Sequence, residues 1–116
     1  MSTDAQVFAG LPVRDLAVAL DWYAAFFGRP ADEIVGDEAM WQVSGSTWVF
    51  VAPDTERAGG GLMTLGVDGI EPFLSRWRAA GLAYEPVETY DNGVRHVTII
   101  DPDGNSLSLA EAPTQA

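Results

Sequence analysis

The chain of 116 residues contains no cysteine and no lysine, and its single histidine is His96. The lack of cysteine excludes disulfides and thiolate metal sites and fits a reducing compartment, so we predict a cytoplasmic protein. One histidine excludes metal centres that need two imidazoles from the same chain. No apolar run reaches the length of about 18 residues that a membrane span requires. Residues 1–6 have neither a basic nor an apolar segment, so we expect no signal peptide.

Basic residues are also few. Six arginines stand against 17 acidic residues, and the formal net charge is −11. A surface of this charge repels polyanions, so we expect neither nucleic acid nor an anionic membrane as a partner. The same surface attracts small cations, although solubility alone also explains most of these carboxylates. The charge balance therefore favours a small-molecule partner over a polyanion.

The organisation of the chain is set by a weak internal repeat. The segment Leu11-Pro12-Val13-Arg14-Asp15-Leu16 resembles Leu65-Gly66-Val67-Asp68-Gly69-Ile70. Each copy has the apolar spacing of a strand, a helix and then three strands. The expected strands are 7–13, 33–35, 39–43, 47–51, 62–67, 83–89, 94–100 and 106–110, and the expected helices are 16–27 and 70–80. We predict an α+β fold, a single domain of two tandem βαβββ modules at 6–52 and 62–111 with a linker at 53–61.

The first expected helix carries more apolar surface than one buried stripe needs. Asp15 is its expected N-cap, and Gly28 is its expected end. The main stripe consists of Leu16, Leu20, Tyr23 and Phe27. Trp22 and Phe26 lie about 100° around the helix from that stripe. They predict either a face that a second chain covers or a wide stripe that faces the core.

A strong turn signal stands at Asp101-Pro102-Asp103-Gly104-Asn105. Pro102 fixes a φ angle that suits a turn, and Gly104 accepts a positive φ. An apolar pair, Ile99-Ile100, precedes the turn, and the strand pattern Ser106-Leu107-Ser108-Leu109 follows it. The segment therefore predicts a β-hairpin.

Together these features resemble the glyoxalase / bleomycin-resistance / extradiol-dioxygenase superfamily, the vicinal oxygen chelate fold. The resemblance rests on the order of the elements and on Val13-Arg14-Asp15-Leu16, Trp22-Tyr23, Phe27-Gly28 and the turn at 101–105. It implies a curved sheet with a central cleft, and it implies a homodimer, because proteins of this fold are commonly homodimers.

The resemblance also implies where metal ligands would stand, on the first and last strands of each module. In this chain those positions are Phe8, Val49, Leu62 and Ser108. The metal enzymes commonly have histidine at the position of Phe8 and usually have glutamate at that of Ser108. None of the four side chains here is a credible ligand for a divalent metal. We therefore expect no metal, no other cofactor and no catalytic residue.

Strand alternation indicates which residues line the implied cleft. If the ligand positions of the superfamily face inward, Thr64 faces inward with them. The predicted ligand-binding residues are Phe8, Trp41, Val49, Leu62, Thr64, His96 and Ser108. This cleft would be apolar and mildly polar, which suits binding better than acid–base chemistry.

Three side chains in or near this set have alternative interpretations. Trp41 is either a stacking wall for a planar or cationic ligand or a part of the core. Trp48 is expected on the helix side of its strand. His96 is either a base or hydrogen-bond donor in the cleft, or a strand histidine that bonds locally or faces solvent.

We predict a metal-independent small-molecule binding protein, a homodimer that sequesters a cationic or aromatic toxic compound. The first alternative is a glyoxalase-like lyase or isomerase that acts without the usual divalent metal, through His96 or a carboxylate. The second alternative is a partner-binding module whose pocket has degenerated. The sequence does not identify the ligand.

Overall fold

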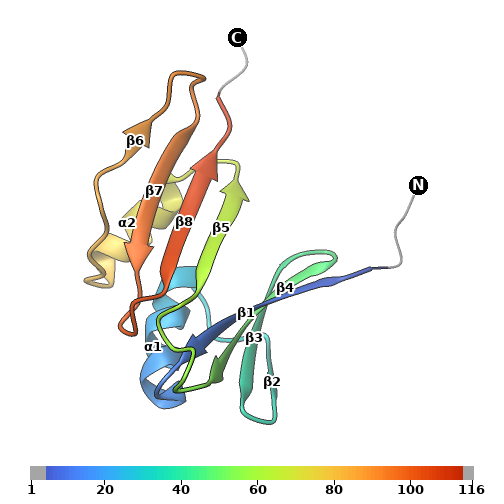
Figure 1. Ribbon diagram of the computed structural model, residues 1–116. Coiled ribbons are helices and arrows are strands. Elements are labelled where there is room, and N and C mark those ends of the chain that lie inside the picture. Colours follow the sequence, from blue (N-terminus) through green and yellow to red (C-terminus); the bar gives the residue numbers. More distant parts are fainter. Residues whose placement is uncertain (1–4, 114–116) are drawn as a thin grey trace.

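The computed structural model describes residues 5–113, which form two four-stranded sheets and two helices (Figure 1). The strands are β1 (Val7–Val13), β2 (Glu33–Val35), β3 (Glu38–Ser44), β4 (Thr47–Pro53), β5 (Leu62–Val67), β6 (Glu88–Thr89), β7 (Arg95–Ile100) and β8 (Ser106–Glu111). The helices are α1 (Leu16–Phe27) and α2 (Glu71–Ala79). Within this range, neither helix has the length and apolar character to cross a membrane.

Each sheet is built from one module. The strand orders are β1-β4-β3-β2 and β5-β8-β7-β6, so the two modules repeat the same topology. In both, the first strand pairs in parallel with the last, and the remaining pairs are antiparallel. The predicted fold of two tandem βαβββ units is therefore confirmed. Because β1 and β5 end their sheets, each has one edge without a strand partner in the described chain.

The predicted strand at 83–89 is wrong over most of its length, since only Glu88–Thr89 is paired. Pro86 lies in the middle of this segment and has no backbone N–H to donate to β7. A single bond remains ahead of it, from the amide of Glu85 to the carbonyl oxygen of Thr98 at 2.9 Å. This segment follows the edge of the sheet without joining the ladder.

One hydrophobic core joins the two modules through their helices. The ring of Phe26 on α1 stacks on the ring of Trp77 on α2, with centroids 5.3 Å apart. The indole N–H of Trp77 donates to the carbonyl oxygen of Phe26 at 3.0 Å. Phe26 is therefore buried within its own chain, and Trp22 packs beside it at the edge of the core. The sequence left open whether a second chain covers this face of α1 or whether it is a wide stripe that faces the core, and for Phe26 the second interpretation is correct.

The turn after β7 does more than close a hairpin. Asp101 is buried, and its carboxylate accepts hydrogen bonds from the hydroxyl of Tyr23 at 2.6 Å and from the side-chain amide of Asn105 at 2.8 Å. Asn105 also donates to the carbonyl oxygen of Pro12 and accepts from the amide of Gly61. Both modules and their connection therefore meet at this turn, which we call the Asp101 clasp.

The clasp has an electrostatic signature at Tyr23. Burial and the adjacent carboxylate of Asp101 raise the pKa of the Tyr23 hydroxyl far above its ordinary value. The hydroxyl thus stays protonated and remains a hydrogen-bond donor. On the surface above it, Arg14 pairs with Asp103 at 2.9 Å and extends the clasp to the start of α1.

Candidate functional site

The candidate site lies on the faces of the two sheets that point away from the helices. On β1, Leu11 and Val13 are buried on the helix side, whereas Phe8 and Gly10 are exposed on the opposite side. The side chain of Phe8 is 51% exposed, and that of Leu62 on β5 is 83% exposed. We call these outward sides the open face of the first sheet and the open face of the second sheet.

The open face of the first sheet is aromatic. Phe8 pairs with Trp48, and Gly10 pairs with Phe50, across the parallel β1–β4 ladder. The ring of Phe50 lies directly over Gly10, because a Cβ atom at Gly10 would stand 2.4 Å from it. The lack of a side chain at Gly10 thus lets the ring lie flat on β1. A shallow hollow of about 220 Å³ adjoins this ring and reaches Arg57.

The open face of the second sheet carries a row of hydroxyl groups. Thr64, Ser108 and Thr98 are register partners across β5, β8 and β7. The hydroxyls of Thr98 and Ser108 lie 3.1 Å apart and share a hydrogen bond. Ser108 is buried at 5% exposure, so Thr64 and Thr98 are the more accessible members of this row.

His96 lies on the same open face, one row from the hydroxyls. Its ring stacks on the ring of Tyr90, with centroids 5.6 Å apart, and its Nδ1 lies 3.8 Å from a carboxylate oxygen of Glu88. Nδ1 is buried and has no hydrogen-bond partner among residues 5–113. The ring is thus held by stacking, and its buried Nδ1 lies near the carboxylate of Glu88 but beyond hydrogen-bond distance.

The structure corrects the placement of two predicted ligand-binding residues. Trp41 is fully buried, stacks on Phe27 with centroids 5.0 Å apart, and donates to the carbonyl oxygen of Arg29. Val49 is also buried on the helix side, and Trp48 is on the open face instead of the helix side. The wrong sides predicted for Val49 and Trp48 share one cause, because every residue of β4 from Trp48 to Ala52 is apolar and alternation does not show which side faces the core.

Val49 would be the counterpart of Ser108 only if Gly45 and Gly104 were equivalent positions in the two hairpins, and they are not. The first hairpin has two residues between β3 and β4, whereas the second has five between β7 and β8. Strand register gives the correct equivalence, because Gly10 pairs with Phe50 in the way that Thr64 pairs with Ser108. The counterpart of Ser108 is therefore Phe50, a residue that the sequence reasoning missed.

The remaining predicted residues form two groups. Leu62, Thr64, His96 and Ser108 belong to the second sheet, and Phe8 belongs to the first. The free edges of β1 and β5 carry Phe8 and Leu62, the most exposed members of the set. Within residues 5–113 the two groups therefore lie on different sheets, and no single sheet forms a cleft lined by both.

The side chains at the metal-ligand positions do not fit a metal. With the corrected register these positions hold Phe8, Phe50, Leu62 and Ser108. Three of them are hydrocarbon, and the hydroxyl of Ser108 is already bonded to Thr98. A divalent metal needs several nitrogen, oxygen or sulfur donors at one point, and no group of three or more His, Asp or Glu residues converges within the described range.

Solved structures share this fold over nearly the whole chain. A glyoxalase / bleomycin resistance protein from Catenulispora acidiphila DSM 44928 is 34% identical, with a TM-score of 0.89, over 95% of this chain and 100% of that chain. A lactoylglutathione lyase from Agrobacterium tumefaciens is 21% identical, with a TM-score of 0.74 and 96% of each chain covered. A bleomycin-binding protein complexed with bleomycin is 18% identical, with a TM-score of 0.73, over 95% of this chain and 98% of that chain. Neither a family model nor a curated protein matches the sequence.

Proposed function

This chain belongs to the glyoxalase / bleomycin-resistance family, and we propose that it is a member that binds a small molecule without a metal. The observation that carries the proposal is the chemistry of the four metal-ligand positions, where three hydrocarbon side chains and one bonded serine replace donors. Loss of all four donors removes the Lewis acid chemistry and leaves the open faces as binding surfaces.

The proposed ligand is an aromatic or cationic compound, and sequestration of a toxic one is the proposed role. Trp48 and Phe50 offer ring faces for stacking, and each such contact contributes about 1 kcal/mol. The net charge of −11 favours a cation over an anion at these exposed faces. One structural relative is described as bound to bleomycin, which makes bleomycin a rational first probe.

The proposed assembly is a homodimer. Phe8 and Leu62 are large apolar side chains on the free edges of β1 and β5, where a second chain would bury them. Light scattering should give a mass twice the 12.4 kDa of one chain. Leu62→Arg should shift that mass towards the monomer, whereas Ile34→Arg, on the exposed short strand β2, should not. A monomeric mass for the unmodified protein overturns the homodimer.

Ligand binding is tested by titrating bleomycin and a set of aromatic amines while recording tryptophan fluorescence. Binding to the first open face should quench Trp48, and Phe8→Ala should weaken it about fivefold. The matched control is Ile34→Ala, another exposed apolar side chain on the first sheet. Neither a chelator nor added zinc should change the affinity. If no compound binds, or if binding requires a metal, the proposal fails.

A second candidate function is a metal-free lyase or isomerase, and the free Nδ1 of His96 favours it. A histidine held by stacking, near a carboxylate and a row of hydroxyls, is a possible general base. In that case His96→Ala abolishes turnover of any substrate that is found. If the protein only binds, His96→Ala leaves the affinity for the first-face ligand unchanged.

A further inference from the structure

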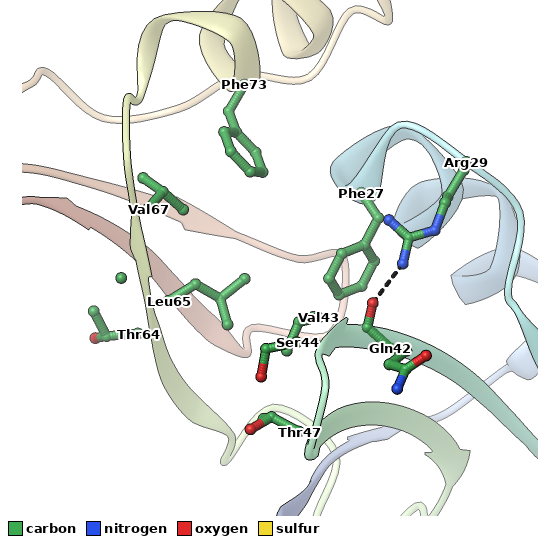
Figure 2. Close-up of a pocket in the computed structure, with 11 residues that line it drawn as sticks. Phe27, Arg29, Gln42, Val43, Ser44, Thr47, Thr64, Leu65, Val67 and Phe73 are labelled. Carbon is green, nitrogen blue, oxygen red and sulfur yellow. Dashed lines mark hydrogen bonds between the residues drawn. The ribbon is translucent and has the colours of Figure 1, made fainter.

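A groove of about 390 Å³ runs along the free edge of β5, between this strand and the β3–β4 hairpin (Figure 2). This volume lies at the lower end of the range for small-molecule sites. Phe27 at the end of α1 and Phe73 on α2 point into the groove from one end, and Leu65 and Val67 line its β5 side. The groove is thus an apolar slot between the two modules. It shares Gln42, the register partner of Trp48, and Thr64 with the open faces.

The polar groups of the groove are hydroxyls, the side-chain amide of Gln42 and a guanidinium. Ser44 and Thr47 supply hydroxyls from the hairpin, and Arg29 reaches from the end of α1 to the carbonyl oxygen of Gln42 (Figure 2). No acidic side chain lines the groove, although acidic residues outnumber basic ones by 17 to 6 in the chain. The lining of the groove therefore carries one cation and no carboxylate, and Asp32, the partner of Arg29, stands outside the lining.

Arg29 is held in position by its neighbours. Its Nε and Nη2 donate to the carboxylate of Asp32, and Nη2 also donates to the carbonyl oxygen of Gln42 at 2.7 Å. Its Nη1 makes no hydrogen bond to any residue in the described range. The bonds to Asp32 fix the plane of the guanidinium without using all of its donors.

A second arginine, Arg76, lies outside the lining of the groove but next to the lining residue Phe73. The guanidinium of Arg76 lies 4.5 Å from the ring centroid of Phe73, and its Nε would stand 2.4 Å from a Cβ atom at Gly28. This Nε is buried without a hydrogen-bond partner, and no ion pair to an acid is formed by Arg76 within residues 5–113. Because Nε is enclosed beside Gly28, Arg76 contributes its positive charge near Phe73 and not a hydrogen bond from this atom.

We propose that this groove is a binding site for a small aromatic carboxylate. The ring would pack against Phe27 and Phe73, and the carboxylate would accept a charge-assisted hydrogen bond from Arg29, while the nearby charge of Arg76 attracts it. This ligand is opposite in charge to the cation proposed for the open faces. The two proposals therefore concern different ligands, and either proposal can hold without the other.

The test is a titration of the isotope-labelled protein with benzoate, followed by amide chemical shifts. Benzoate should bind with a Kd on the order of 1 mM or tighter, and the largest shifts should be at 42–47 and 64–67. Benzylamine and benzyl alcohol, which share the ring but lack the carboxylate, should cause much smaller shifts there. Equal binding of the amine, shifts confined to the open faces, or no binding up to about 10 mM overturns the proposal.

Three variants locate the carboxylate. Arg29→Gln removes the cation that lines the groove and should weaken benzoate about tenfold. Arg76→Met keeps the aliphatic stem, removes the charge next to the groove, and should weaken benzoate about threefold. The control is Arg57→Gln, which removes the same charge from a side chain that is 84% exposed and lies outside the groove. If Arg29→Gln disturbs the fold, Arg76→Met still decides, because Arg76 has no acidic partner in the described chain. Equal weakening by Arg57→Gln shows a general charge effect and overturns the site.

Discussion

The two modules share one topology, but their open faces differ in chemistry. On β4 the outward residues include Trp48 and Phe50, whereas on the equivalent strand β8 they are Ser106 and Ser108. The core-facing residues of these two strands are Val49, Val51, Leu107 and Leu109. Folding requires the same apolar residues on the core side of both sheets and places no such demand on the open sides. The residues on the open faces are therefore the ones whose chemistry reflects function, because folding does not dictate them.

The largest expected effect separates the two sides of the first sheet. Trp41→Ala should lower the free energy of unfolding by about 3–5 kcal/mol, because it empties a fully buried site beneath α1. Trp48→Ala, on the open face, should cost less than about 1.5 kcal/mol and should weaken ligand binding instead. Urea denaturation measures both values. Similar losses for the two variants contradict the assignment of Trp48 to the open face.

The second prediction compares the two hairpins. Asp101→Ala should lower the free energy of unfolding by about 3 kcal/mol, because the buried hydroxyl of Tyr23 and the amide of Asn105 each lose an acceptor. Gly45→Ala, in the hairpin of the first module, should change it by less than about 0.5 kcal/mol, since nothing lies within 4 Å of the added methyl group. A small loss for Asp101→Ala means that the clasp does not hold the modules together.

The third prediction sharpens the description of the hydroxyl row. Ser108→Ala and Thr98→Val should each cost about 1 kcal/mol, and the double variant should cost less than their sum, because the two hydroxyls bond each other. The measurement is a double-mutant cycle by urea denaturation. Strict additivity indicates that the two hydroxyls are not coupled and are free to bond a ligand.

The smallest expected effect concerns the ion pair at the end of α1. The hydrogen bond from Arg29, and then that from the amide of Gln42, lower the pKa of Asp32. The carboxylate is charged in both states above its ordinary pKa of 3.8, so its stabilisation is fully present there and is lost as the pH falls through the lower folded value. Because the pair is partly exposed, Asp32→Asn should cost only about 0.5 kcal/mol at neutral pH.

The pH dependence supplies the check on this last prediction. The difference in unfolding free energy between the unmodified protein and Asp32→Asn should shrink as the pH falls below 3.8 and vanish once Asp32 is protonated in the folded state, and high salt should reduce it at neutral pH. The control is Asp37→Asn, on an exposed turn where Asp37 makes no ion pair with any residue in the described range. A difference that persists in acid means that the ion pair is not its source.

Much of the fold could be predicted from the sequence because the signals for it are local. Helical and alternating patterns predict both helices and most strands, and the cap at Asp15 is present in the structure. The failures arise where local signals are ambiguous. Every residue from Trp48 to Ala52 is apolar, so alternation alone cannot say which side of β4 faces the core. Strand register resolves this ambiguity, because Phe50 pairs with Gly10 and therefore lies on the same open side of the sheet.

The candidate site could be predicted only in part for the same reason. The absence of metal donors at Phe8, Leu62 and Ser108 can be read from residue types, and the corrected fourth position, Phe50, has the same consequence. The proposed roles of Arg29 and Arg76 could not be anticipated, because the two residues lie far apart in the chain and Arg76 reaches Gly28, the neighbour of Arg29, only where α1 and α2 pack together.

The sequence by itself determined the topology, the acidic charge and the lack of donors for a metal. These properties depend on residue types and on spacing along the chain, which folding does not change. The tertiary structure decided which side of each strand is open, how the Asp101 clasp joins the modules, and where a groove without acidic walls lies. Those features depend on register and on contacts between distant segments, and neither is specified by local pattern.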